Sequence, residues 1–340
     1  MKKWIWLPIL VSVWMTGCST IPQSREAGST AEIAVIGLQP EGTMLGIYAA
    51  AEGRADAAPS IYRGRGDTPA AAVEDLSDSG EQLVSCTHVE HLILSRNGVD
   101  RLEEVLSYAF QDIRQSTESQ LWLVQGEDLS ATFCGEQDPA KRLAVLKSAG
   151  KDGRGFRPLT LREAAAAAAA GEALLIPALR QGEDGLEFIG FGLCHKGRVA
   201  AWLTGEAALG ASLLMGEPIR WTASAGQWAL SLRSTGIQAE PVWEGDRITG
   251  LTLRCPIEGL RVGGWQEMPE DEASIGRQTI QAMNAALRIM KNVGVDAVGL
   301  KNTVGMSSPL KWQALSGQWE KVFPHLTVTF SVPVTTVERH

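Results

Sequence analysis

A buried strand, an amphipathic helix and a second buried strand follow one another within residues 92–125. Residues 92–94 form a short apolar run, which is typical of a strand inside a sheet. Over residues 102–113 the apolar side chains recur at intervals of three and four, which predicts a helix with one buried face. Residues 120–125 repeat the apolar strand pattern. This alternation predicts an α/β fold in which helices pack on a sheet.

The rest of the chain adds helices and antiparallel strands. Thr160 and Glu163 form a capping-box sequence in front of seven alanines, which predicts a short helix. Two apolar segments on either side of the turn Lys196-Gly197 predict a hairpin of residues 186–193 and 198–203. Helices are further predicted at 275–293 and from Ser308-Pro309 onward, a glycine-rich loop at 259–264, and a closing strand at 326–334 whose Pro333 end lies at a sheet edge.

Two segments rich in glycine or charge divide the 340-residue chain. The first is 147–157, and the second runs from the glycine-rich loop through the acidic residues 267–272. The predicted fold class is therefore α/β (α+β), with three small domains that each hold a mixed or antiparallel β-sheet flanked by helices. Their predicted bounds are 31–155 for the N-terminal α/β domain, 158–265 for the middle domain and 271–340 for the C-terminal domain.

The N-terminus has the pattern of an export signal. Lys2 and Lys3 precede an apolar run over residues 4–15, which is shorter than the about 20 residues that span a bilayer. The run ends in Thr-Gly-Cys, which resembles a bacterial lipobox. We therefore predict a signal peptide at 1–17, lipidation of Cys18 and a flexible lipidated tether at 18–30. The alternative is an ordinary cleaved signal that happens to precede a cysteine.

Charge and hydropathy restrict the partners. Removal of the signal with Lys2 and Lys3 changes the net charge from −8 to −10, and an acidic chain is poorly suited to nucleic acid, whose phosphates require Lys and Arg. No second apolar run approaches bilayer length, so the predicted link to the membrane is the lipid, which anchors stably when two acyl chains are present.

The only cluster of metal-ligand residue types is Cys86, His88, Glu90 and His91. In a strand the first three share a face and His91 points away, whereas a zinc site needs ligands that converge. The sequence also has no Gly-x-Ser-x-Gly, no His-Glu-x-x-His and no phosphate loop. We therefore predict no catalytic residue, no metal and no cofactor.

Four cysteines remain after Cys18. An even number in an exported chain permits two disulfides. Their apolar surroundings instead favour buried free thiols. The disulfide state stays open for Cys86, Cys134, Cys194 and Cys255.

A series of short motifs runs in order along the chain. The motifs are 66–72, 88–95, Pro177, 202–206, Gly216, 294–300, 308–312, Trp319, Phe323-Pro324 and the alternating valines that follow. Together they resemble those of the Ger(x)C family, the lipoprotein C subunits of spore germinant receptors. Ser19 and Thr20 stand where the family usually has Trp-Asp, and Leu38-Gln39 replaces a strand-ending Asp.

The resemblance implies a non-enzymatic subunit, anchored by the palmitate-type lipid on Cys18 to the extracytoplasmic face of a membrane. It would assemble with two integral membrane receptor subunits at the spore inner membrane and act in nutrient-triggered germination. Direct binding of a nutrient is left open. The alternative hypothesis is an exported lipoprotein enzyme or solute-binding protein with a site around Cys86, His88 and His91.

Overall fold

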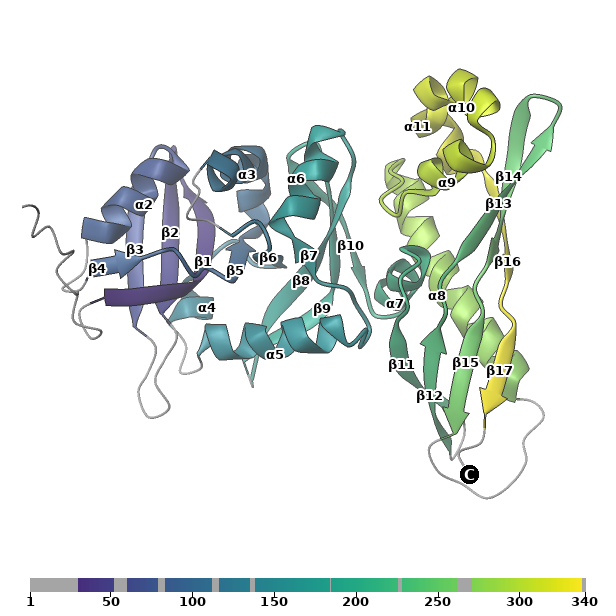
Figure 1. Cartoon of the computed structure of the whole chain (residues 1–340), viewed down its shortest axis with the longest axis horizontal. Coiled ribbons are helices and arrows are strands. Elements are labelled where there is room, and N and C mark those ends of the chain that lie inside the picture. Colours follow the sequence, from purple (N-terminus) through teal and green to yellow (C-terminus); the bar gives the residue numbers. More distant parts are fainter. Residues whose placement is uncertain are drawn as a thin grey trace, which may run out of the picture.

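The computed structural model describes residues 30–51, 60–78, 83–111, 116–134, 138–183, 185–225, 228–261 and 271–337. The predicted signal peptide and all but the last residue of the predicted tether lie outside this range. The molecule is elongated, with a large sheet at one end and two smaller sheets at the other (Figure 1). Its mixture of helices and sheets confirms the predicted fold class. Among the described helices, none is long and apolar enough to cross a membrane.

The large sheet has ten strands, of which eight lie in the order β10-β9-β8-β6-β5-β1-β2-β3. Its centre is parallel, because β8, β6, β5 and β1 run in the same direction. Antiparallel hairpins extend both edges. The two remaining strands are β4, which pairs with β1, and β7, which pairs with β6. The strands are β1 (Thr30–Glu41), β2 (Met44–Ala51), β3 (Ile61–Gly66), β4 (Leu83–Ser85), β5 (His91–Leu94), β6 (Gln120–Val124), β7 (Leu159–Thr160), β8 (Leu174–Gly182), β9 (Gly185–His195) and β10 (Arg198–Thr204).

Helices cover both faces of this sheet, as a parallel sheet requires. In Figure 1, α2, α3 and α6 lie above it and α4 and α5 below. Alternation along β6 sends Leu121 and Leu123 to one apolar cluster and Trp122 to the other. The helices are α2 (Pro69–Asp78), the 3-10 helix η1 (Arg96–Arg101), α3 (Leu102–Gln111), α4 (Ser130–Phe133), α5 (Pro139–Lys151) and α6 (Leu161–Ala169).

The predicted strand–helix–strand unit is confirmed as β5, α3 and β6. The predicted alanine-rich helix is α6, whose Thr160–Glu163 capping box is present. The hairpin predicted around Lys196-Gly197 is β9 and β10.

The segment expected to separate the first two domains does not interrupt the sheet. Residues 147–157 begin inside α5, and β8, β9 and β10 continue the sheet that β1 begins. Backbone pairing therefore links the two parts of the chain across this boundary. The division into domains at 31–155, 158–265 and 271–340 remains a prediction.

The other end of the molecule is built from two small sheets and a long helix. One sheet has the order β11-β12-β15-β17 and the other β13-β14-β16. The long helix α8 (Asp271–Val293), predicted at 275–293, contacts α7, β10, β11 and β17. The other elements are α7 (Glu206–Leu214), β11 (Arg220–Ala225), β12 (Trp228–Ser234), β13 (Gln238–Glu244), β14 (Arg247–Arg254), β15 (Ile257–Arg261), β16 (Thr327–Ser331) and β17 (Val334–Val337).

The prediction of one closing strand is wrong, because two short strands join different sheets. β16 pairs with β14, and β17 pairs with β15. Pro333 lies between them and has no N–H to continue a ladder. Its carbonyl accepts from Ile257 N at 2.9 Å, just after Pro256 breaks the neighbouring chain between β14 and β15. The two proline-containing breaks thus lie side by side where the chain crosses between sheets. β17 ends its sheet, so the expectation of an edge at Pro333 is confirmed.

The loop predicted at 259–264 is also wrong over its described part, because residues up to Arg261 belong to β15. Gly259 packs closely against the neighbouring strand. A Cβ there would lie 3.2 Å from Thr336 Cγ2 on β17.

The helix predicted from Ser308 onward is broken into short pieces. The pieces are α10 (Pro309–Leu315), η2 (Ser316–Gln318), α11 (Trp319–Val322) and η3 (Phe323–His325). A further helix, α9 (Leu300–Ser307), precedes the predicted start. Trp312 and Trp319 nevertheless meet, with ring centroids 5.4 Å apart.

Asp296 fixes the start of this helical region. Its carboxylate accepts from Leu300 N at 3.0 Å, Lys301 N at 2.8 Å and Trp319 Nε1 at 3.0 Å. The motif 294–300 therefore ties α9 to α11 around the half-buried side chain of Asp296. Burial raises the pKa of Asp296, although these three donors act in the opposite direction.

We predict that Gly210→Ala destabilises the protein by about 2 kcal/mol, because a Cβ on α7 would collide with the carbonyl oxygen of Ala282 on α8. The shift of the urea midpoint measures this effect. Gly317→Ala is the control, because a Cβ there meets no atom within 4 Å. An unchanged midpoint for Gly210→Ala would contradict the close packing of the two helices.

Candidate functional site

Cys18, the predicted lipidation site, lies outside the described residues. Its modification therefore remains a prediction. The other predicted site residues all lie in the described structure.

Cys86, His88 and His91 do not form a common site. The strand assumed for 86–91 is wrong over its first part, because β4 ends at Ser85 and residues 87–88 form a turn. His88 is exposed, Cys86 is half-buried and His91 is buried in the core. Among the described residues, no group of three or more His, Cys, Asp or Glu side chains can hold a metal ion.

His91 has a structural environment. It accepts a hydrogen bond at Nδ1 from Trp122 Nε1, with 3.2 Å between the nitrogens. Burial lowers the pKa of His91 to about 4, assisted by the charge of Lys147 and opposed by Glu90. The imidazole is therefore neutral at physiological pH, and its role is to satisfy the indole inside the sheet.

Cys134, Cys194 and Cys255 are free thiols. Cys194 and Cys255 are buried, as the sequence predicted, and burial raises their pKa to about 12 and about 11. The prediction is wrong for Cys134, which is exposed, and for Cys86, which is half-buried. Each of these two cysteines directly follows the end of an element, β4 or α4, and the apolar residues beside it in the sequence do not indicate that position.

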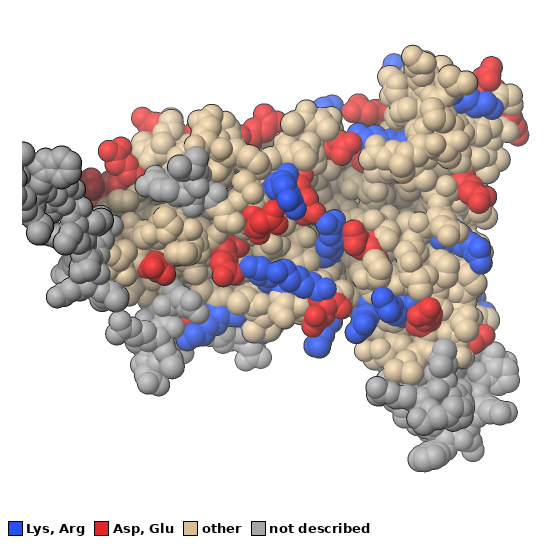
Figure 2. All heavy atoms as spheres, viewed as in Figure 1, with Lys and Arg blue, Asp and Glu red and all other residues tan. Residues whose placement is uncertain are grey.

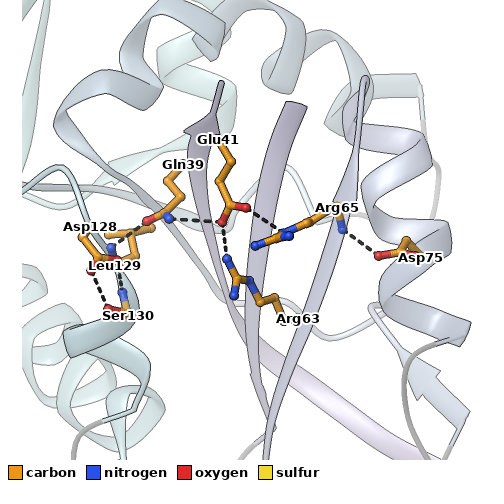
Figure 3. Close-up of polar contacts among 8 residues, drawn as sticks. All are labelled: Gln39, Glu41, Arg63, Arg65, Asp75, Asp128, Leu129 and Ser130. Carbon is orange, nitrogen blue, oxygen red and sulfur yellow. Dashed lines mark hydrogen bonds and ion pairs between the residues drawn. The ribbon is translucent and has the colours of Figure 1, made fainter. Parts of the chain in front are cut away.

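A polar cluster that the sequence analysis missed lies at the ends of β1 and β3 (Figure 3). Glu41 at the end of β1 forms two ion pairs. Its Oε1 lies 2.6 Å from Arg63 Nη2, and its Oε2 lies 2.7 Å from Arg65 Nε. Both arginines come from β3 and point the same way because they are two residues apart. We refer to Gln39, Glu41, Arg63 and Arg65 as the Glu41 cluster.

Gln39 connects this cluster to the loop after β6. Its Oε1 accepts from Leu129 N at 2.7 Å, and its Nε2 donates to Glu41 Oε1 at 3.3 Å. Gln39 is buried, so the amide of Leu129 has a fixed partner. Gly46 leaves room for the carboxylate, because a Cβ there would lie 2.5 Å from Glu41 Oε1.

The electrostatics of the cluster favour ionised Glu41. Burial alone would raise its pKa, but the hydrogen bond and charge of Arg63, with Gln39 and Arg65, outweigh burial and lower the pKa. One carboxylate is shared by two guanidinium groups, so the cluster keeps a positive charge. The side chains of Arg63 and Arg65 are 46% and 51% exposed and can donate further hydrogen bonds to an acidic group.

The sequence held a weak signal for this cluster. Gln39 and Glu41, and likewise Arg63 and Arg65, are spaced by two residues in strands. Nothing in the sequence indicates that β1 and β3 are separated only by β2, which brings these pairs together.

Neutral His91 predicts a loss of stability in acid. The imidazole of the unfolded chain binds a proton near pH 6.5, whereas that of the folded chain binds one only near pH 4. The contribution of neutral His91 to the free energy of unfolding is therefore complete above pH 6.5 and is lost as the pH falls to 4. The loss from this group is about 3 kcal/mol. Urea unfolding at pH 7 and pH 4.5 should show a weaker pH dependence in His91→Asn, which retains an acceptor for Trp122. Equal slopes for both proteins would contradict this account.

The Glu41 cluster predicts different costs for its members. Gln39→Ala removes the buried partner of Leu129 N and should cost about 1–3 kcal/mol. Arg65→Ala breaks a solvent-exposed ion pair and should cost less than about 1 kcal/mol. Urea unfolding measures both, with Arg180→Ala as a control at another exposed ion pair. A larger cost for Arg65→Ala than for Gln39→Ala would reverse the assignment.

Comparisons with known proteins concern both the C-terminal region and the whole fold. Residues 265–339 match the family model described as "Spore germination B3/ GerAC like, C-terminal". No curated protein sequence matches the chain significantly.

A solved structure, described as "Crystal Structure of the GerBC protein", is similar to this chain with a TM-score of 0.60 and 13% sequence identity. The similarity covers 90% of this chain and 97% of that chain, so the two share a fold over nearly their whole length. The C-terminal family match and this shared fold confirm the resemblance found in the sequence.

Proposed function

We propose that this chain is the lipid-anchored C subunit of a spore germinant receptor and acts without catalysis. It assembles with two integral membrane subunits on the extracytoplasmic face of the spore inner membrane and takes part in nutrient-triggered germination. The observation that carries the proposal is the match of residues 265–339 to a spore-germination family on a chain with the fold of the GerBC protein.

The N-terminal sequence supports the anchoring part of the proposal. Cys18 follows a short export signal and precedes 11 residues that lead into β1, the first described strand. A chain of this acidity has no electrostatic attraction to anionic lipid, so attachment depends on the acyl chains. Confinement to the membrane surface raises the effective concentration for membrane partners.

The described chemistry supports a role through contacts. Buried Cys194 and Cys255 are protonated thiols and therefore weak nucleophiles. The alternative of an exported enzyme or solute-binding protein around Cys86, His88 and His91 has no common site, because His91 lies in the core and His88 on the surface.

We predict that Cys18→Ala releases the chain from the membrane fraction by about tenfold or more, because the lipid is its anchor. Palmitate labelling and fractionation measure the anchor. The decrease in optical density of spores after a nutrient pulse measures germination, which should be impaired.

Cys134→Ala is the matched control, because Cys134 is an exposed free thiol in the described body. It should keep both the label and germination. A Cys18→Ala chain that stays membrane-bound and supports normal germination would refute the proposal.

A further inference from the structure

The most exposed large apolar side chains of the described structure are Leu310 and Met306, at 87% and 77%. They lie on the two sides of Ser308, where α9 ends and α10 begins. The five residues 306–310 carry no charge, and we call them the α9–α10 tip. In Figure 1 these helices project from the second half of the molecule, and Figure 2 shows few charged side chains over them on the visible face. An exposed apolar pair on a projection is typical of a contact surface.

The residues on either side hold the tip in place. Gly305 lies so close to Trp312 that a Cβ on the glycine would be 3.1 Å from Trp312 Cδ1. Lys311 Nζ donates to the carbonyl oxygen of Gly245 at 2.6 Å, which ties α10 to the turn between β13 and β14. The exposed side chains of the tip therefore stand on a fixed support and are not needed for its packing.

The C-terminal region is a basic part of an acidic chain. Residues 273–337 contain six Lys and Arg but only two acidic residues, Asp296 and Glu320, so their net charge is +4. The whole chain has a net charge of −8. The β13–β14 turn beside the tip adds two acidic residues and one basic residue, which lowers the local charge to +3. An anionic surface therefore attracts this region although it repels the chain as a whole.

Three cations of the region are available to an anionic surface. Arg277 and Arg288 on α8 and Lys321 on α11 are exposed and form no ion pair within the part of the chain that the structure describes. A spacing of 11 residues places the two arginines on the same face of α8. Lys301, by contrast, is paired with Glu172 at 2.9 Å.

The chain that precedes the structure indicates which surface is near. Cys18, the proposed lipid anchor, is followed by 11 residues before β1, and an extended segment of that length reaches about 36 Å. The bilayer that holds the acyl chains therefore lies close to β1. In Figure 1, β1 and the α9–α10 tip lie toward opposite ends of the elongated molecule. Both can meet one bilayer when the long axis lies along the membrane.

We propose that the α9–α10 tip inserts into the surface of an anionic phospholipid bilayer and is a second point of attachment beside the lipid anchor. Met306 and Leu310 enter the boundary between headgroups and acyl chains, and the positive charge of residues 273–337 favours this side of the molecule. The orientation along the membrane rests on the lipid anchor of the proposed function. The contact of the tip does not, and it is tested without the anchor.

The mature chain from residue 18 onward, with Cys18→Ser, carries no lipid and isolates the contact of the tip. Flotation measures the fraction of this chain that is bound to vesicles. Vesicles of phosphatidylcholine and phosphatidylglycerol should bind it about threefold or more better than vesicles of phosphatidylcholine alone, because cations gain only from anionic headgroups.

The double variant Met306→Ser, Leu310→Ser should lower binding to the anionic vesicles by about tenfold, because it removes the apolar groups that enter the bilayer. Val145→Ser on α5 is the matched control, because Val145 is 59% exposed but lies outside the tip, and it should bind as the unaltered chain does. All these changes are at exposed positions, and an unchanged urea midpoint verifies that each variant is folded.

The proposal is overturned if the unlipidated chain does not float with anionic vesicles, or if it floats equally well with both kinds. It is also overturned if the double variant binds as well as the Val145→Ser chain. An apolar surface of a partner subunit is the other occupant that such a tip could have. In lipidated chains, loss of germination by the double variant with unchanged flotation of its unlipidated form would assign the tip to that partner and refute the bilayer contact. None of these outcomes depends on whether Cys18 is lipidated, which the Cys18→Ala experiment decides separately.

Discussion

Burial of the parallel strands β1, β5, β6 and β8 under helices on both faces organises the larger half of the molecule. Parallel strands cannot be joined by tight turns, so helices must connect them and cover the sheet. The strands are accordingly apolar on both faces, as in β6, which is buried at every position. Antiparallel hairpins extend the sheet on both sides of these four strands. The Glu41 cluster lies at the ends of β1 and β3 in this sheet.

The second half of the molecule has two small sheets, which pack with few helices. α7 and α8 approach so closely that Gly210 cannot carry a side chain. The chain passes from one small sheet to the other at Pro256 and Pro333, where the missing N–H groups end one ladder and allow another to begin. The family match falls on this half, with α8, α9–α11, β16 and β17 inside it.

The described polar groups are used mainly for structure. His91 satisfies Trp122, Asp296 starts α9, and Gln39 holds the loop at Leu129. Gln120 differs, because its amide oxygen is buried without a partner beside a cavity.

Local pattern alone determined much of the secondary structure. The strand–helix–strand unit of β5, α3 and β6, the capped alanine helix α6 and the hairpin of β9 and β10 were predictable because spacing, caps and turn residues act over a few neighbours. The predicted export signal and the predicted lipidation of Cys18 rest on the sequence alone. Tertiary structure decided the rest. Two strands replaced one closing strand, and Cys134 lies on the surface. The ion pairs Arg162–Glu118 and Arg157–Glu217 join residues that are 44 and 60 positions apart in the sequence. These outcomes depend on which strands pair and which helices pack together. The sequence does not determine them, because one pattern of apolar residues is compatible with several strand pairings.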